Sequence, residues 1–205
     1  MSSNADDLTA RARIRDAAIR LFAEKGIDAA SIRDIAQGAG VSSGLLRHHF
    51  GSKEGLRDAC DEYAMAQITE IGNQFIEFGS LSRVTPEVLL LQRYLVRSTM
   101  DGSPAGNALF DQMIEYGMHW LDTSGPKVPD PVAFLALICV MKMSMFTMGD
   151  QLTRVLGVDT AEPEGWARML AASVEIFSRP LVTPEQAEQM RGALARFHTP
   201  EDPHE

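Results

Sequence analysis

The chain of 205 residues is 45% hydrophobic and 23% charged, which is ordinary for a globular protein and excludes a wholly disordered one. Its two cysteines, Cys60 and Cys139, are too few for a disulfide scaffold or a cysteine zinc site. The net charge of -9 excludes a protein that coats nucleic acid with most of its surface.

The charge is unevenly distributed along the chain. Residues 1–60 carry nine Lys or Arg against eight Asp or Glu, whereas residues 61–205 carry ten against twenty. An acidic body joined to a near-neutral head that contains arginines allows contact with a polyanion through one face only. The first seven residues are polar and acidic and lack the order of a signal peptide, so we expect an intracellular, cytoplasmic protein.

Two helices are expected first in the chain. Apolar residues recur at helical spacing over 9–25, and Gly26 ends the run. Ser31 is placed to cap a short helix over 31–37, and Asp34 stands where a capping box has its carboxylate.

A turn over 38–41 and a third helix over 42–49, capped by its first residue, complete the proportions of a helix-turn-helix. Small residues in the turn allow the two helices to cross closely, and Val41 is an apolar plug. Leu46 and Phe50 are expected to anchor the third helix on the first. The face left exposed consists of Ser42, Ser43, Gly44, Leu45, Arg47 and His48.

This exposed face has the chemistry of a nucleic-acid contact. It carries short hydroxyl donors, one guanidinium and one imidazole, and it has no carboxylate to repel phosphate. A slim helix end that contains Gly44 fits into a major groove, where Arg and Ser side chains reach base edges. Lys53, at the start of the next helix, adds a phosphate contact with help from the helix dipole.

Two other interpretations of this segment are weaker. His48 and His49 are adjacent, so on a helix they point about 100° apart and do not share a metal ion; no metal site is expected. The run 40–44 fits the Gly-x-Ser-x-Gly pattern of a hydrolase built on Ser42, but that pattern requires a preceding strand. We therefore expect no catalytic activity and no cofactor.

The rest of the chain also has helical periodicity, so the expected fold class is all-α. Ser52 is placed to cap a long helix that reaches Phe78, and residues 79–84 form a linker. Gly117 weakens the middle of its helix and allows a division into two pieces. Both ends, 1–7 and 199–205, are expected to be disordered. The further helices are expected at about 85–100, 104–123, 131–156, 163–178 and 184–197.

Residues 131–149 carry one charge, Lys142, among apolar residues and resemble a membrane span. Polar interruptions, acidic flanks and the lack of a basic flank argue against a membrane. A helix that is apolar all round is instead buried on both sides. We expect 131–156 and 163–178 to form a dimer interface, with 184–197 as the alternative.

The body is rich in methionine and aromatic residues, which suit either a core or an adaptable cavity. Arg93 and Arg97 are four residues apart on one helix face and either clamp a carboxylate or form a solvated edge. An apolar or weakly amphipathic effector is expected. The candidate ligand-binding residues are Arg93, Tyr94, Arg97, Phe110, Met113, Tyr116, His119, Trp120, Lys142, Met145 and Phe146.

The run from Ser31 to Leu56, SIRDIAQGAGVSSGLLRHHFGSKEGL, resembles the DNA-binding signature of the TetR family of bacterial regulators. The resemblance covers about residues 8–58. It implies a three-helix head, a ligand-binding helical body and a homodimer, in a family that mostly represses transcription until a small molecule binds. By position it implies that Ser31 and Lys53 hold phosphates and that these residues face the groove: Arg33, Ser43, Leu45, Arg47 and His48.

Two positions depart from the family's usual pattern. The family often has a tyrosine where this chain has Arg47, and a threonine where it has Leu45. Arg47 is suited to hold a phosphate or to read a guanine, and Leu45 to contact a thymine methyl.

Together these features predict a DNA-binding domain over 1–52 and a ligand-binding and dimerisation domain over 53–205. The expected protein is a ligand-responsive repressor that binds a palindromic double-stranded operator as a homodimer and has no membrane partner. Open alternatives are a transcriptional activator, a regulator without an effector, and a small-molecule-binding protein whose head no longer binds DNA.

Overall fold

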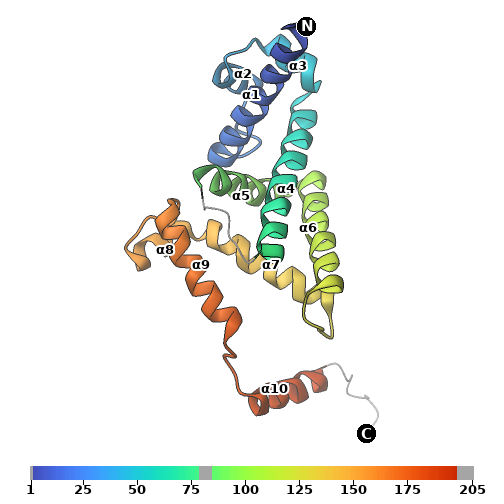
Figure 1. Cartoon of the computed structure of the whole chain (residues 1–205), viewed down its shortest axis with the longest axis vertical. Coiled ribbons are helices and arrows are strands. Elements are labelled where there is room, and N and C mark those ends of the chain that lie inside the picture. The colour runs from blue at the N-terminus through green and yellow to red at the C-terminus, as the bar shows by residue number, and fades with distance from the viewer. Residues whose placement is uncertain (1, 79–84, 198–205) are drawn as a thin grey trace.

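The computed structural model describes the backbone of residues 2–78 and 85–197, with the side chains of 8–73 and 85–196. In these ranges the chain forms ten helices and no strand, which confirms the predicted all-α class (Figure 1). In chain order they are α1 (Ser2–Lys25), α2 (Ile32–Ala39), α3 (Ser43–Phe50), α4 (Lys53–Phe78), α5 (Pro86–Thr99), α6 (Pro104–Thr123), α7 (Pro131–Thr147), α8 (Gly149–Leu156), α9 (Pro163–Ser178) and α10 (Pro184–Phe197).

The helices α1–α3 form a head at one end of the molecule, and α4 runs from this head into the body (Figure 1). One hydrophobic core continues from the head into the body, because α1 packs against both α4 and α5. Phe22 of α1 stacks on Tyr94 of α5 with ring centroids 6.1 Å apart, and both side chains are fully buried. This continuity gives the body a direct mechanical connection to the head.

Helix α1 begins at Ser2, seven residues before the predicted start at Thr9. The expected disorder of 1–7 is therefore wrong for residues 2–7, where no Pro or Gly stops the helix from propagating. Residue 1, the predicted linker over 79–84 and the terminal segment 199–205 lie outside the described residues.

The predicted single helix over 131–156 is also wrong, because α7 and α8 meet at a bend of 69°. Side-chain hydroxyls at the end of α7 bond back to the helix, Ser144 to the carbonyl of Met141 and Thr147 to that of Ser144. Such bonds bend helices, and Met148 at the break has φ -104° and ψ 23°, outside the helical range.

Helix α6 is continuous through Gly117, so the division allowed by this glycine does not occur. A Cβ atom at position 117 would lie 2.8 Å from a methyl carbon of Leu135 in α7. The glycine therefore permits the close packing of α6 on α7.

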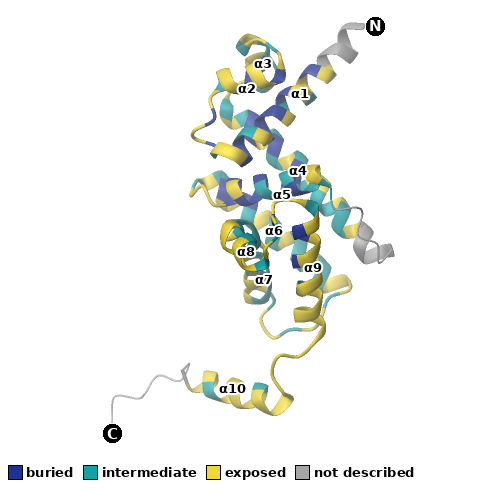
Figure 2. Ribbon diagram, turned by 90° about the vertical axis from the view of Figure 1, so that its left-hand side faces the viewer, coloured by how far each residue is buried: buried dark blue, intermediate teal, exposed yellow. Residues whose placement is uncertain are grey.

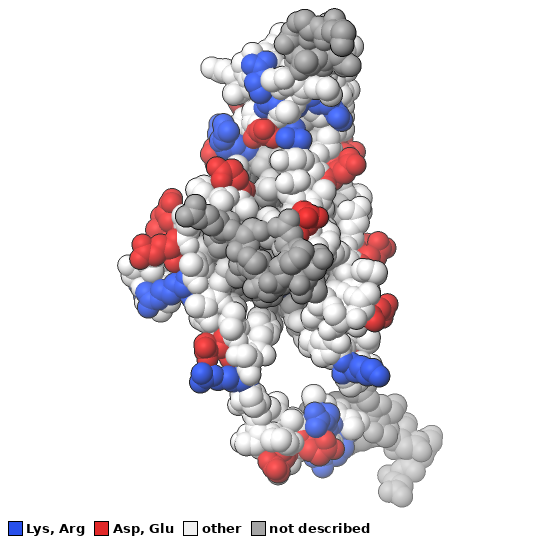
Figure 3. All heavy atoms as spheres, in the orientation of Figure 1, with Lys and Arg blue, Asp and Glu red and all other residues white. Residues whose placement is uncertain are grey.

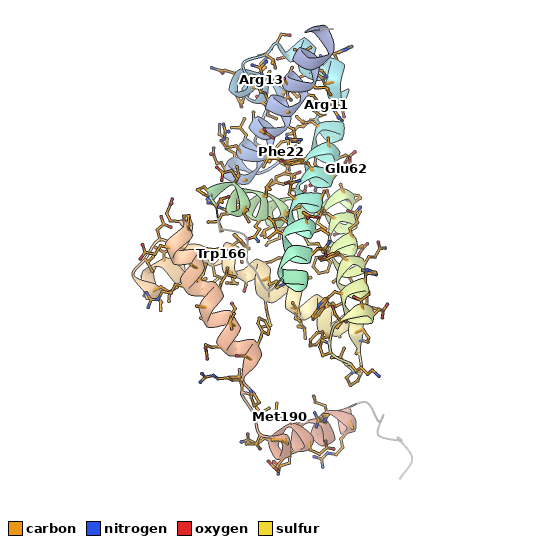
Figure 4. All side chains as sticks on the ribbon, in the orientation of Figure 1. Arg11, Arg13, Phe22, Glu62, Trp166 and Met190 are labelled. Atoms are coloured by element: carbon orange, nitrogen blue, oxygen red, sulfur yellow. The ribbon has the colours of Figure 1, made fainter. Side chains whose placement is uncertain are left out.

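The last two helices, α9 and α10, make the least extensive contacts with the rest of the described chain. Trp166 and Met169 of α9 are buried with Leu89 and Phe146 in a second, small core, and Figure 4 shows Trp166 at the end of α9 that faces α7. Beyond them α9 and α10 are exposed (Figure 2), and α10, with Met190, stands apart from the other helices (Figures 1 and 4). No single helix within the described ranges is long and apolar enough to cross a membrane.

Candidate nucleic-acid interface and apolar cavity

The start of α2 is fixed by the predicted capping box. Ser31 Oγ accepts a hydrogen bond from the backbone N–H of Asp34 (3.1 Å), and Asp34 Oδ2 accepts one from the N–H of Ser31 (3.4 Å). Hydrogen bonding of the carboxylate to the Ser31 side chain and backbone N–H lowers the pKa of Asp34, so the carboxylate stays ionised near the positive end of the helix dipole.

Loss of this box gives a first testable prediction. Ser31→Ala removes the side-chain acceptor and should lower the free energy of unfolding by about 1 kcal/mol, measured by urea unfolding. The control is Ser43→Ala, since the Ser43 hydroxyl makes no hydrogen bond with any described residue; it should change stability by less than about 0.5 kcal/mol. Equal effects at the two serines would contradict the capping role.

The turn between α2 and α3 requires its small residues. Gly40 has a positive φ of 66° and ends α2, a conformation that favours glycine. The N–H of Val41 donates to the carbonyl of Ala36 (3.0 Å), which closes the turn. Ala36 and Ala39 are buried against α1, and these contacts set the angle at which α3 leaves the turn.

Helix α3 presents the predicted face to solvent. Leu46 is fully buried, and Phe50 packs on the core beneath the Arg11 guanidinium, 5.4 Å from its ring centroid. The helix contains no Asp or Glu. Ser43 and Leu45 are half-buried, and the predicted residues that are exposed are Ser42, Gly44, Arg47 and His48.

The charge around α3 suits a polyanion. On the face shown in Figure 3, Lys and Arg side chains gather over the end formed by α1–α3, while acidic side chains are spread along the body. Arg33 on α2 and Arg47 on α3 are exposed and form no ion pair with any described residue. Lys53 is half-buried, and its Nζ donates to the carbonyl of Asp28 (3.0 Å), so part of its role is to tie the loop before α2 to α4.

Ser42 acts as the cap of α3, with its Oγ accepting from the N–H of Leu45 at 3.1 Å. It follows helix α2, so the strand that a nucleophile elbow requires does not precede it. The rings of His48 and His49 lie edge to face, 5.7 Å apart. Within the described residues no group of three His, Cys, Asp or Glu side chains is arranged to hold a metal ion.

A second candidate site is an apolar, partly open cavity of about 330 Å³ lined by α4, α5, α6, α7 and α9. It brings together five of the predicted ligand-binding residues, namely Met113, Tyr116, Lys142, Met145 and Phe146. The residues that sequence reasoning missed are Met65, Ile68, Thr69, Gln92, Leu95, Val96, Cys139, Met143, Trp166, Leu170 and Ser173.

The other predicted ligand-binding residues lie elsewhere. Arg93 and Arg97 line a separate, more polar cavity of about 580 Å³ beside the α1–α2 loop, where Arg93 also donates to the carbonyl of Ala161 (3.2 Å). Tyr94 is fully buried in the core. Phe110, His119 and Trp120 of α6 are outside both cavities.

A buried polar cluster joins α4 to α5 and to the loop before α6. The Arg57 guanidinium donates to Ser98 Oγ and to the Ser98 carbonyl, and it pairs with Asp101 at 2.7 Å. Arg57 also lies 3.5 Å from Asp61, which accepts hydrogen bonds from Tyr94 and Ser98. Arg57 is 6% exposed, so its charge is balanced within the protein rather than by water.

The pKa values of the two carboxylates in this cluster, Asp61 and Asp101, are shifted in opposite directions. Burial raises the pKa of Asp61, and hydrogen bonds from Tyr94 and Ser98 offset this only in part. For Asp101 burial also opposes ionisation, but hydrogen bonds from Ser103 and Arg57 outweigh it and lower the pKa. Arg57 thus adds to these hydrogen bonds in favouring the charged form of both carboxylates.

Comparison with known proteins agrees with this arrangement. The family described as "Bacterial regulatory proteins, tetR family" matches residues 14–60, from α1 into α4. A transcriptional regulatory protein of Mycobacterium tuberculosis, RaaS, is 38% identical over 126 residues, with 57% of each chain covered. The repressor KstR2 of Rhodococcus jostii is 33% identical over 106 residues, covering 52% of this chain and 50% of the relative.

Solved structures extend the likeness of fold into the body. A protein assigned to the TetR-family transcriptional regulators, from Rhodococcus sp., superposes with a TM-score of 0.54 at 17% identity, covering 68% of this chain and 86% of that one. The chain spans about half the length of the curated relatives it matches.

The fold and the head thus define an all-helical protein with an N-terminal helix-turn-helix. Residues 14–60, which form most of the head, match the TetR family of bacterial regulatory proteins.

Proposed function

We propose that this protein is a transcriptional repressor that binds a palindromic DNA operator as a homodimer and is released by a small apolar or amphipathic effector. The observation that carries the proposal is the exposed face of α3, which has no carboxylate and is held on a capped, tightly packed helix-turn-helix. Nine predicted residues form the DNA contact: Ser31, Arg33, Ser42, Ser43, Gly44, Leu45, Arg47, His48 and Lys53. Such a function places the protein in the cytoplasm and needs no catalytic group.

The head and the body have different roles in this proposal, and the continuous core connects them. Residues 1–52 contact DNA, and residues 53–205 bind the effector and the second subunit. The two α3 helices of a dimer must lie one DNA turn, or a multiple of it, apart to read a palindrome. A ligand in the apolar cavity contacts α4, which begins at Lys53 beside the head. It releases DNA only if it binds the conformation with the wrong spacing more tightly.

Selection of random duplex DNA on the purified protein at moderate salt tests this function. Enrichment of an inverted repeat is the expected result, since a symmetric dimer reads two half-sites. Binding should also weaken steeply with salt, because phosphate contacts supply much of the affinity. A protein that enriches no sequence at low salt, after removal of any bound small molecule, contradicts DNA recognition and favours a head that no longer binds DNA.

Repression and activation differ in the response of a promoter. A reporter that carries the selected operator should be silenced by the protein and restored by an effector, whereas an activator raises its expression.

The dimer surface is proposed on α7 and α9, with α10 as the alternative. Helix α7 exposes Leu137 (65%) and Val140 (54%), and α9 exposes Val174 and Phe177 (58% each). An exposed apolar surface on several adjacent helices marks an interaction site. Burial of both sides of α7 is thus expected only in the assembled dimer.

Substitutions that introduce charges into this surface test whether it forms the dimer interface. Val174→Asp with Phe177→Asp should raise the dimer dissociation constant at least about tenfold in sedimentation equilibrium, because each carboxylate would be buried without a partner. The control is Glu175→Ala, which alters the same helix at an exposed position. A wild-type protein that is monomeric at micromolar concentration contradicts the homodimer.

A further inference from the structure

The apolar cavity contains one polar atom whose hydrogen bond is not made. Gln92 of α5 lines the cavity, and its Oε1 is buried without a hydrogen-bond partner among the described residues. A buried acceptor left unpaired costs free energy, and such groups in folded proteins are usually satisfied. A ligand in the cavity is therefore the natural source of a donor for this oxygen.

Two hydroxyl groups of the cavity wall donate their protons to other groups of the protein. Tyr116 donates to Asn73 Oδ1 (2.9 Å), and Ser173 donates to the carbonyl of Met169 (3.0 Å). What each hydroxyl oxygen still offers is its acceptor capacity. Gln92, Tyr116 and Ser173 can thus each accept a hydrogen bond, and Gln92 Oε1 is the buried one left without a donor among the described residues, so a ligand that donates a hydrogen bond satisfies it.

The charge of the wall argues against an anionic ligand. Among the described residues that line the cavity there is no Asp, Glu, Arg or His, and the single cation, Lys142, is exposed on α7. Burial raises the pKa of the Cys139 thiol, so this group is neutral as well. An ionised carboxylate or phosphate within the cavity would lose its water without gaining a buried counter-ion.

We propose that the cavity takes a neutral, largely apolar molecule with one hydroxyl or amide N–H group, and that this group donates a hydrogen bond to Gln92 Oε1. The inference rests on the proposed function, in which the ligand of this cavity releases the protein from DNA. It adds the chemical class of the ligand and the residue that selects it.

Three ten-carbon probes test the class. The probes are 1-decanol, its isomer methyl nonyl ether, which only accepts hydrogen bonds, and decanoate. Trp166 lies in the cavity wall and Trp120 does not, so the fluorescence of the full-length Trp120→Phe protein at pH 7 reports binding. We expect 1-decanol to bind about tenfold more tightly than the ether, and more tightly than decanoate.

Matched variants test the residue. Gln92→Met keeps the length of the side chain and removes the acceptor. It should therefore weaken the binding of 1-decanol by about tenfold and change the affinity for the ether by less than about twofold. Gln112→Met, at an exposed position of α6 outside the cavity, should change neither. Equal binding of the alcohol and the ether, tighter binding of decanoate, a preference that survives Gln92→Met, or no binding of any probe up to its solubility limit would each overturn the assignment.

This test contains no DNA, so it separates the two proposals. An alcohol preference that depends on Gln92 in a protein that enriches no DNA would retain the ligand class and reject the regulator. Selection of an inverted repeat by a protein without that preference would retain the regulator and reject the ligand class.

Discussion

Replacement of Arg33 and Arg47 together by alanine should weaken operator binding by at least about 30-fold. A good arginine contact with a base or a phosphate contributes about 1–3 kcal/mol, and both side chains are exposed beside α3. If both arginines hold phosphates in each subunit of the dimer, about four contacts are lost and the slope of log K against log salt should also fall in magnitude by roughly four. Fluorescence anisotropy with the selected operator at several salt concentrations measures both quantities.

A charge-matched control separates a local contact from the general field of the protein. Arg154→Ala with Arg191→Ala removes the same charge from exposed positions of α8 and α10, far along the chain from α3. This variant should retain operator affinity within about threefold, since exposed charges beyond a Debye length are screened. A loss equal to that of the Arg33 and Arg47 variant would remove these two residues from the interface.

Sequence preference distinguishes the two roles left open for Arg47. If Arg47 holds a phosphate, Arg47→Ala weakens binding to all sequences alike, whereas if it reads a guanine, the same change relaxes the preference at one operator position. Repeating the random-duplex selection with Arg47→Ala shows which occurs. The same comparison for Leu45→Thr tests contact with a thymine methyl.

The head could be predicted from the sequence because its determinants are local. A capping serine, a carboxylate three residues later and a left-handed glycine each act within one turn of backbone, and Ser31, Asp34 and Gly40 take the expected places. The break between α7 and α8 escaped prediction because α7 is apolar all round and neither Pro nor Gly stands at Met148 to mark its end. Its cause lies in the hydroxyls of Ser144 and Thr147, whose bonding to the helix depends on their rotamers.

The cavity was less predictable because five helices contribute to it. Aromatic and methionine content indicated that residues such as Met145 and Phe146 suit a core or a cavity, but composition does not show which faces meet. The sequence did not indicate that Gln92 lines a cavity, since a glutamine on an amphipathic helix is usually a surface residue. Tyr94 was wrongly predicted to bind the ligand, because its hydroxyl instead donates a hydrogen bond to the buried Asp61.

Replacement of Arg57 by methionine should lower the free energy of unfolding by about 3–5 kcal/mol, because it breaks a buried ion pair from one side. Asp61 and Asp101 would lose their cation, although their side chains are only 13% and 17% exposed. Urea unfolding at pH 7 measures the loss. The control is Arg179→Met, whose partner Glu175 and own side chain are both exposed; it should cost less than about 1 kcal/mol.

The pH dependence shows that an unpaired carboxylate is responsible for the lost stability. The folded-state pKa of Asp61 is raised by burial, and loss of Arg57 raises it further because the nearby positive charge is gone. A carboxylate whose pKa is raised by folding lowers the free energy of unfolding when the pH is above that pKa. This cost disappears as the pH falls through the folded-state pKa. The deficit of Arg57→Met relative to wild type should therefore shrink as the pH falls below 7.

A second substitution tests this explanation at constant pH. Arg57→Met with Asp61→Asn replaces the unpaired charge by a neutral amide of similar size and should recover part of the lost stability at pH 7. If it recovers none, the loss comes from the unpaired Asp101 or from the missing hydrogen bonds to Ser98 and Ser103. In either case the cluster fixes α4 to α5 just below the head, so a ligand that moves α4 must also strain these bonds.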